Sequence, residues 1–75
     1  MIAMRVRINI DTLSKVNKFV GICAKLGGKI DLVDGEGYRV SAKSLIGAMA
    51  TMDWNCVYVE SERDIYAHIR EFVEI

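Results

Sequence analysis

Few side chains in this 75-residue sequence could carry out acid–base, nucleophilic or metal chemistry. The chain has one histidine, His68, and two cysteines, Cys23 and Cys56, whose separation matches no spacing typical of metal ligands. His68 lies next to the apolar positions of a predicted helix, so we expect its ring to pack at the edge of the core. Two cysteines allow at most one disulfide, and we expect both to be reduced core thiols. The sequence therefore predicts no metal site and no bound cofactor.

Hydroxyl and amino groups gather where the first helix is predicted to begin. Asp11 or Thr12 is suited to cap the free backbone amides of that helix. The amides, with Lys15 and Lys18 nearby, could also bind an anion. Thr12 and Ser14 cannot relay a phosphoryl group, because a hydroxyl forms an ester that does not pass the group on readily. A plain helix cap and an anion site both remain open for this segment.

Ser44 lies at the predicted start of a second, short helix, between Lys43 and Leu45. Its hydroxyl can accept a hydrogen bond from a free amide of the first turn, as a capping residue does. A phosphate group on Ser44 would meet the positive end of the helix dipole and could be accommodated without unfolding the helix. Ser44 is thus either a plain cap or a cap that is also phosphorylated.

Large apolar residues follow Ser44 in greater number than a helix of about two turns needs for anchoring. They are Ile46, Met49, Met52 and Trp54. Some of them must face solvent, where methionine side chains adapt well to a protein partner. These residues either close one end of the core or form a docking surface.

The first half of the sequence supplies a strand, a helix and a hairpin. Apolar residues alternate with polar ones over 2–10, which predicts a strand. From 13 to 26 they recur at steps of three and four, which predicts an amphipathic helix. Residues 29–41 alternate again on both sides of Asp34-Gly35-Glu36-Gly37, a sequence typical of a turn, and so predict a hairpin.

The second half supplies the short helix over 44–52, a strand over 56–60 and a last helix. Ser61 and Asp64 have the spacing of a capping box for that helix, whose expected buried stripe is Ile65, Ile69, Phe72 and Val73. The sequence thus predicts a single α+β domain over 1–75 with the order βαββαβα. We expect a two-layer, open-faced sandwich in which three helices cover one face of a four-stranded antiparallel sheet. The open face should be solvated and carry Arg5, Arg7, Lys29, Asp31 and Arg39.

Charge and hydropathy exclude several classes of partner. Ten basic and ten acidic residues give no net charge, so the protein offers no long-range attraction for a polyanion, and we expect no nucleic-acid partner. No stretch approaches the roughly 18 apolar residues of a membrane span, and Arg5 and Arg7 interrupt any signal-peptide core. We expect a cytoplasmic protein with no membrane partner.

The order of elements, together with Ser41-Ala42-Lys43-Ser44-Leu45 at the start of the short helix, resembles the HPr family. HPr is the histidine-containing phosphocarrier of the bacterial sugar phosphotransferase system. The resemblance extends from Met4 to Val73 and implies an open-faced sandwich. It also implies that an HPr-kinase-like enzyme phosphorylates Ser44. The short helix, with Lys43, Ile46, Met49, Met52 and Trp54, would then be a docking surface for proteins of the phosphotransferase or catabolite-regulation network.

The segment that carries the phosphoryl group departs from the family pattern. HPr proteins have a histidine at the start of the first helix, within Gly-x-His-x-Arg-Pro, and Thr12 or Leu13 stands at that place here. The segment Thr12, Leu13, Ser14, Lys15 contains no imidazole. We therefore expect a non-enzymatic variant that regulates or binds other proteins without relaying phosphate. Two alternatives are an anion-binding or small-molecule-binding module on the same scaffold, and a carrier that uses another residue.

Overall fold

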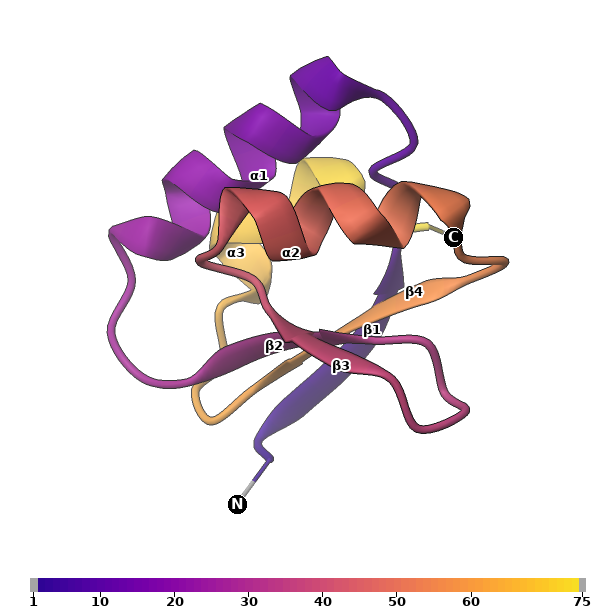
Figure 1. The fold of residues 1–75 in the computed structure, drawn as a ribbon. Coiled ribbons are helices and arrows are strands. Elements are labelled where there is room, and N and C mark those ends of the chain that lie inside the picture. The colour runs from indigo at the N-terminus through magenta and orange to yellow at the C-terminus, as the bar shows by residue number, and fades with distance from the viewer. Residues whose placement is uncertain (1, 75) are drawn as a thin grey trace.

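Strands and helices follow one another in the predicted order in the computed structural model, which describes residues 2–74 (Figure 1). The strands are β1 (Met4–Ile8), β2 (Ile30–Val33), β3 (Arg39–Ser41) and β4 (Val57–Ser61). The helices are α1 (Leu13–Ala24), α2 (Leu45–Ala50) and α3 (Tyr66–Ile69), and single 3-10 turns, η1 (Thr51–Asp53) and η2 (Arg70–Phe72), extend the last two. None of the helices within these residues is long and apolar enough to cross a membrane.

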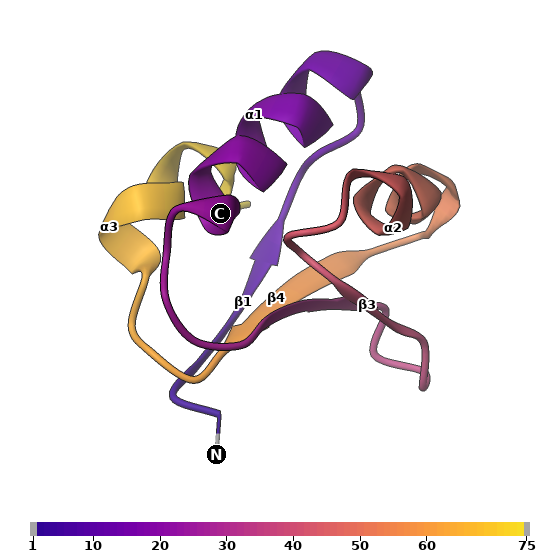
Figure 2. The same ribbon diagram turned by 60° about the vertical axis from the view of Figure 1, so that its left-hand side comes forward.

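The four strands form one antiparallel sheet in the order β1-β4-β2-β3. Val59 at the centre of β4 pairs with Val6 of β1 on one side and with Leu32 of β2 on the other. All three helices lie on one face of this sheet (Figure 1). Figure 2 shows α1 between α3 and α2, and α1 contacts both. The predicted α+β open-faced sandwich is therefore confirmed.

The core lies between the sheet and α1. Val16, Phe19 and Cys23 recur at helical spacing along α1 and are fully buried against the sheet. The Phe19 ring meets the ring of Phe72 edge to face, with centroids 5.2 Å apart. Burying side chains of this size contributes about 1.5–3 kcal/mol each, so this helix face anchors the helical layer on the sheet.

The predicted capping box before the last helix is wrong. Ser61 is the last residue of β4, is buried, and accepts a hydrogen bond from the backbone amide of Arg63. Asp64 accepts instead from the amide of Tyr66, two residues on, where α3 begins. The strand ends one residue later than its apolar pattern predicted, and α3 begins only at Tyr66. The predicted stripe is nonetheless in place, since Ile65, Ile69 and Phe72 are buried and Val73 packs against the core.

Candidate functional site

The start of α2 is built around Ser44, and its predicted capping role is confirmed. The Ser44 backbone is extended, and its hydroxyl accepts a hydrogen bond from the amide of Gly47 at 3.2 Å. Its carbonyl accepts the first helical bond, from the amide of Ala48 at 2.8 Å. The side chain of Ser44 is exposed. An exposed hydroxyl at a helix start is accessible to a modifying enzyme.

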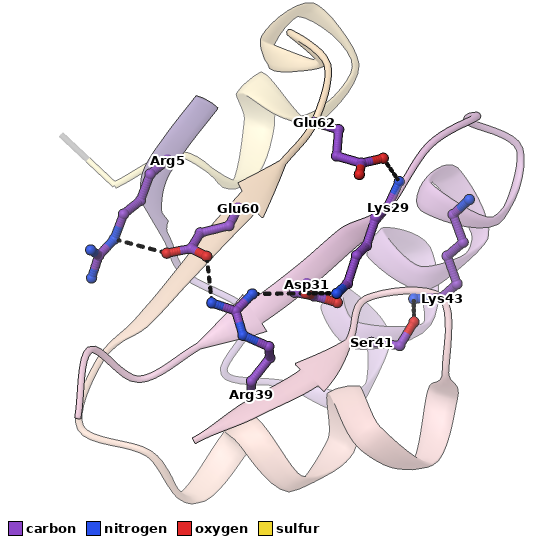
Figure 3. A network of polar contacts seen from close by, with 8 residues as sticks. All are labelled: Arg5, Lys29, Asp31, Arg39, Ser41, Lys43, Glu60 and Glu62. Carbon is purple, nitrogen blue, oxygen red and sulfur yellow. Dashed lines mark hydrogen bonds and ion pairs between the residues drawn. The ribbon is translucent and has the colours of Figure 1, made fainter. Parts of the chain in front are cut away.

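The turn that presents Ser44 is held by one local hydrogen bond and by two bonds to more distant parts of the fold. The amide of buried Ala42 donates to the carbonyl of Ile30, and the amide of Lys43 donates to the Ser41 hydroxyl at 3.1 Å (Figure 3). The Lys43 ammonium group donates to the carbonyl of Leu26, just beyond α1, at 2.7 Å. Lys43, expected to contact partners, is therefore an exposed residue whose amine also joins the end of α1 to the start of α2.

An apolar surface follows Ser44 along α2 and η1, and we call it the α2 patch. It consists of Leu45, Ile46, Met49 and Met52, with 41%, 84%, 42% and 39% of their surfaces exposed. Leu45 and Ile46 lie four and three residues before Met49, and Met52 lies three residues after it, so the four share one side of the helical segment. Ala48 and Thr51 occupy the other side and are buried. Leu45 was not predicted as a member, although its i,i+4 spacing to Met49 was the available signal.

Trp54, the remaining apolar residue expected at this surface, lies beyond η1 and is half-buried. Its ring packs against the edge of the core and is tilted by 33° relative to the ring of Tyr38, with centroids 6.4 Å apart. Trp54 also borders a hollow of about 210 Å³ that it shares with Met52 and Asp11. This hollow places the connection before α1 next to the end of the α2 patch.

The start of α1 holds Thr12 and Leu13, the positions that the resemblance to HPr would assign to the histidine. Thr12, one of two expected caps, is the cap that forms, because its hydroxyl accepts from the amide of Lys15 at 3.2 Å. The Lys15 amine pairs with Asp11 at 3.2 Å. Leu13 and Ser14 are exposed, and Leu13 therefore does not join the core as its helical spacing predicted. No imidazole lies in this segment.

The histidine itself lies elsewhere, on α3. His68 is exposed rather than packed at the core edge as expected. It shares a shallow hollow with Lys18 of α1 and with Lys25, the residue that follows this helix. The amine of Lys18 is 2.9 Å from the carboxylate of Glu71. Both lysines considered for anion binding, Lys15 and Lys18, thus already have a carboxylate partner.

The open face of the sheet carries a connected group of charges (Figure 3). Asp31 of β2 pairs directly with Glu60 of β4, and two like charges in this relation repel each other. Arg39 reaches across from β3 and donates to both carboxylates at 2.8 Å. Arg5 and Lys29 approach the same carboxylates at 3.7 and 3.8 Å.

This arrangement corrects one expectation about the open face. Asp31, expected to be solvated, is only 6% exposed, and Glu60 is 7% exposed, because the arginine side chain covers them. The hydrogen bond to Asp31, followed by that to Glu60, raises the pKa of Arg39 above its ordinary value. Arg39 therefore stays charged and holds β3 to the two inner strands.

The two cysteines are free thiols in different surroundings. Cys23 is fully buried, and burial raises its pKa from an ordinary value near 9 to about 12, against a smaller opposing effect of Lys43. Cys56 is half-buried just before β4, and its sulfur lies 3.5 Å from the carbonyl of Asp34. A thiol held protonated at neutral pH is a poor nucleophile, so Cys23 fits the expected inert role.

Comparison with known proteins adds no further assignment. The chain matches no protein-family model, and searches of curated proteins and of solved structures also found no match. Across residues 2–74, no group of three or more histidine, cysteine, aspartate or glutamate side chains is placed to hold a metal ion.

Proposed function

We propose that this protein is a cytoplasmic, HPr-like regulatory protein of the bacterial sugar phosphotransferase network that binds other proteins and does not relay phosphate. The observation that carries the proposal is the position of an exposed capping serine, Ser44, directly beside the exposed α2 patch. The Ser41 to Leu45 resemblance to HPr supports the choice of network. The protein acts by binding, not as an enzyme.

The side chains of the α2 patch indicate what kind of surface a partner must present. Ile46 is 84% exposed, so little of its surface packs against the protein and its side chain can enter an apolar pocket of a partner. Met49 and Met52 are unbranched and can adjust their shape to the same partner. A partner protein with an apolar recess, ringed by polar groups that reach Lys43 and Ser44, fits this surface.

Phosphorylation of Ser44 by an HPr-kinase-like enzyme would control that contact. The phosphate would add about 1.5–2 negative charges at the edge of the α2 patch. It would lie next to Lys43, whose amine is held by the Leu26 carbonyl. Charge at the rim of an interface alters association and partner choice without any movement of the backbone. The modification therefore selects between partners rather than switching the fold.

The start of α1 argues against the other two functions. Relay requires an imidazole, and Thr12 and Ser14 supply only hydroxyls. An anion site would need cations free to face the ligand, whereas Lys15 pairs with Asp11 and Lys18 with Glu71. At the start of α1, neither phosphoryl relay nor anion binding therefore has a structural observation in its favour.

Two incubations followed by mass measurement test the proposal. Phosphoenolpyruvate with the first enzyme of the phosphotransferase system should add no acid-labile phosphate. ATP with the HPr-kinase-like enzyme of the source organism should add one acid-stable phosphoryl group, which Ser44→Ala abolishes. A labile phosphate transferred at a rate comparable to a true HPr would overturn the non-relaying function.

A binding assay tests the docking surface separately. Ile46→Asp should leave the melting temperature nearly unchanged, because the side chain is exposed, and should abolish binding to the kinase and to regulatory partners. Ile2→Asp is the matched control, since Ile2 is 55% exposed and lies outside the α2 patch. If both folded variants bind every partner as the wild type does, the α2 patch is not the docking surface.

A further inference from the structure

A hollow of about 420 Å³ lies between the turn joining β2 to β3 and the connection from η1 to β4. We call it the aromatic hollow. The residues that line it include three aromatic ones, Tyr38, Trp54 and Tyr58, and three acidic ones, Asp34, Glu36 and Asp53. No member of the α2 patch borders it. Its volume falls in the range of small-ligand sites, about 300–1,000 Å³.

The turn that forms one wall is held in a defined shape. The Asp34 carboxylate accepts hydrogen bonds from the amides of Glu36 and Tyr38, at 2.7 and 3.1 Å. Gly35 has a φ of +84°, and a Cβ there would meet the Tyr58 ring at 3.5 Å, so the turn lies close over that ring. Tyr38 is thereby carried to the rim, where 70% of its surface is exposed.

The rings of Tyr38 and Trp54 are not fully buried in the core. Tyr38 faces Trp54 across 6.4 Å with a tilt of 33°, and both rings remain in contact with solvent. The Arg5 guanidinium lies over the Tyr58 ring, 4.6 Å from its centroid. That ring face is thus already occupied by a cation of the protein, and the faces left for a ligand are those of Tyr38 and Trp54.

The charge around the hollow is negative. Three acidic residues and one basic residue, Arg5, line it, and the charge of Arg5 is met by Glu60 at 3.7 Å. Within residues 2–74, neither Glu36 nor Asp53 forms an ion pair. Two uncompensated carboxylates beside exposed aromatic faces favour a positively charged guest that is weakly hydrated.

We propose that the aromatic hollow binds an organic cation, either an alkylammonium or a guanidinium group. The ring faces would contact the cation, and Glu36 and Asp53 would supply the balancing charge. The group could belong to a free small molecule or to a side chain of a partner protein, and the chemistry is shared. The site does not depend on Ser44 or on the α2 patch.

Trp54 is the only tryptophan, so its fluorescence reports directly on the hollow. Choline is titrated against its uncharged isostere dimethylbutanol, and N-acetylarginine amide against N-acetylcitrulline amide. A saturable change in Trp54 fluorescence with a cationic compound, and no change with its neutral counterpart, supports the proposal. Choline alone would indicate a free small cation, and the arginine amide alone a partner side chain. No change, or equal change with charged and neutral compounds, overturns it.

Variants locate the binding. Tyr38→Ala should weaken affinity for the responding cation about two- to fivefold, while Tyr66→Ala, at a half-exposed tyrosine outside the hollow, should not. The double variant Glu36→Gln with Asp53→Asn should weaken it about fivefold or more. Its control of equal charge is Asp64→Asn with Glu71→Gln. Equal affinities in the double variant and its control would place the cation elsewhere and refute the site.

Discussion

Replacing Ser44 by alanine should destabilise the protein by about 1 kcal/mol, within a usual range of about 0.5–2 kcal/mol for a lost N-cap. The change removes one acceptor, the hydroxyl that binds the Gly47 amide at 3.2 Å. Helix α2 has only six residues, so the loss falls on an element with few internal hydrogen bonds to compensate. For a domain of this size, about 1 kcal/mol corresponds to a fall in melting temperature of about 4–8 °C.

Urea unfolding and thermal melts measure this effect, with two comparisons on the same chain. Ser44→Asp should stay within about 0.5 kcal/mol of the wild type, because a carboxylate caps the same amide and suits the helix dipole. Ser14→Ala makes the same chemical change in the first turn of α1, where Thr12 is the cap, and should also stay within about 0.5 kcal/mol.

The Ser44 hydroxyl does not stabilise the protein as a cap if Ser44→Ala is no less stable than Ser14→Ala. The same conclusion follows if Ser44→Asp loses as much stability as Ser44→Ala, since the carboxylate would then not replace the hydroxyl as acceptor.

Three further outcomes follow from burial and charge. Because the pKa of Cys23 is raised to about 12 in the folded protein, stability should be lost as pH rises above 9. The stability gap between wild type and Cys23→Ala should narrow by about 2 kcal/mol between about pH 8 and about pH 10.5, and an unchanged gap in urea titrations would contradict the shift. Arg39→Gln should lower the melting temperature clearly, since Asp31 and Glu60 then face each other uncovered, and the further change Glu60→Gln should restore part of the loss. If adding Glu60→Gln does not raise the melting temperature of the Arg39→Gln variant, charge repulsion is not the cause of the loss. His68→Gln should change stability by less than about 0.5 kcal/mol, and loss of partner binding in that folded variant would give His68 a role not argued above.

Periodicity predicted the fold well because the apolar faces of the helices had only the apolar face of the sheet to pack against. Alternation indicated Leu32 as an apolar position of its strand, and helical spacing placed Val16 and Phe19 on the apolar face of the first helix; all three are buried. The strand that holds Val59 was predicted from its content of strand-forming residues. The boundaries were less accurate. The capping box failed because Ser61 and Asp64 fit the spacing, but hydrogen bonding with Ala3 and pairing with Met4 extend β4 through Ser61.

The site was predicted only where local rules govern it. The Ser44 cap depends on neighbouring residues, so the sequence sufficed. Burial of Asp31 depends on Arg39 reaching across the sheet, and alternation gives the face of a residue but not what covers it. The contact of Tyr38 with Trp54 joins two loops whose meeting depends on tertiary packing, so no sequence pattern predicts it.

The charges over the open face also decide how the hairpin comes apart. β3 has three residues, pairs only with β2, and is held to the inner strands by Arg39. Lifting β3 removes that arginine from two facing carboxylates, so even a small opening meets a steep electrostatic cost that added salt reduces. Because Ser44 and α2 follow β3 directly, we expect them to open with it as one cooperative unit. Amide hydrogen exchange in β3 and α2 should then speed up together as ionic strength rises.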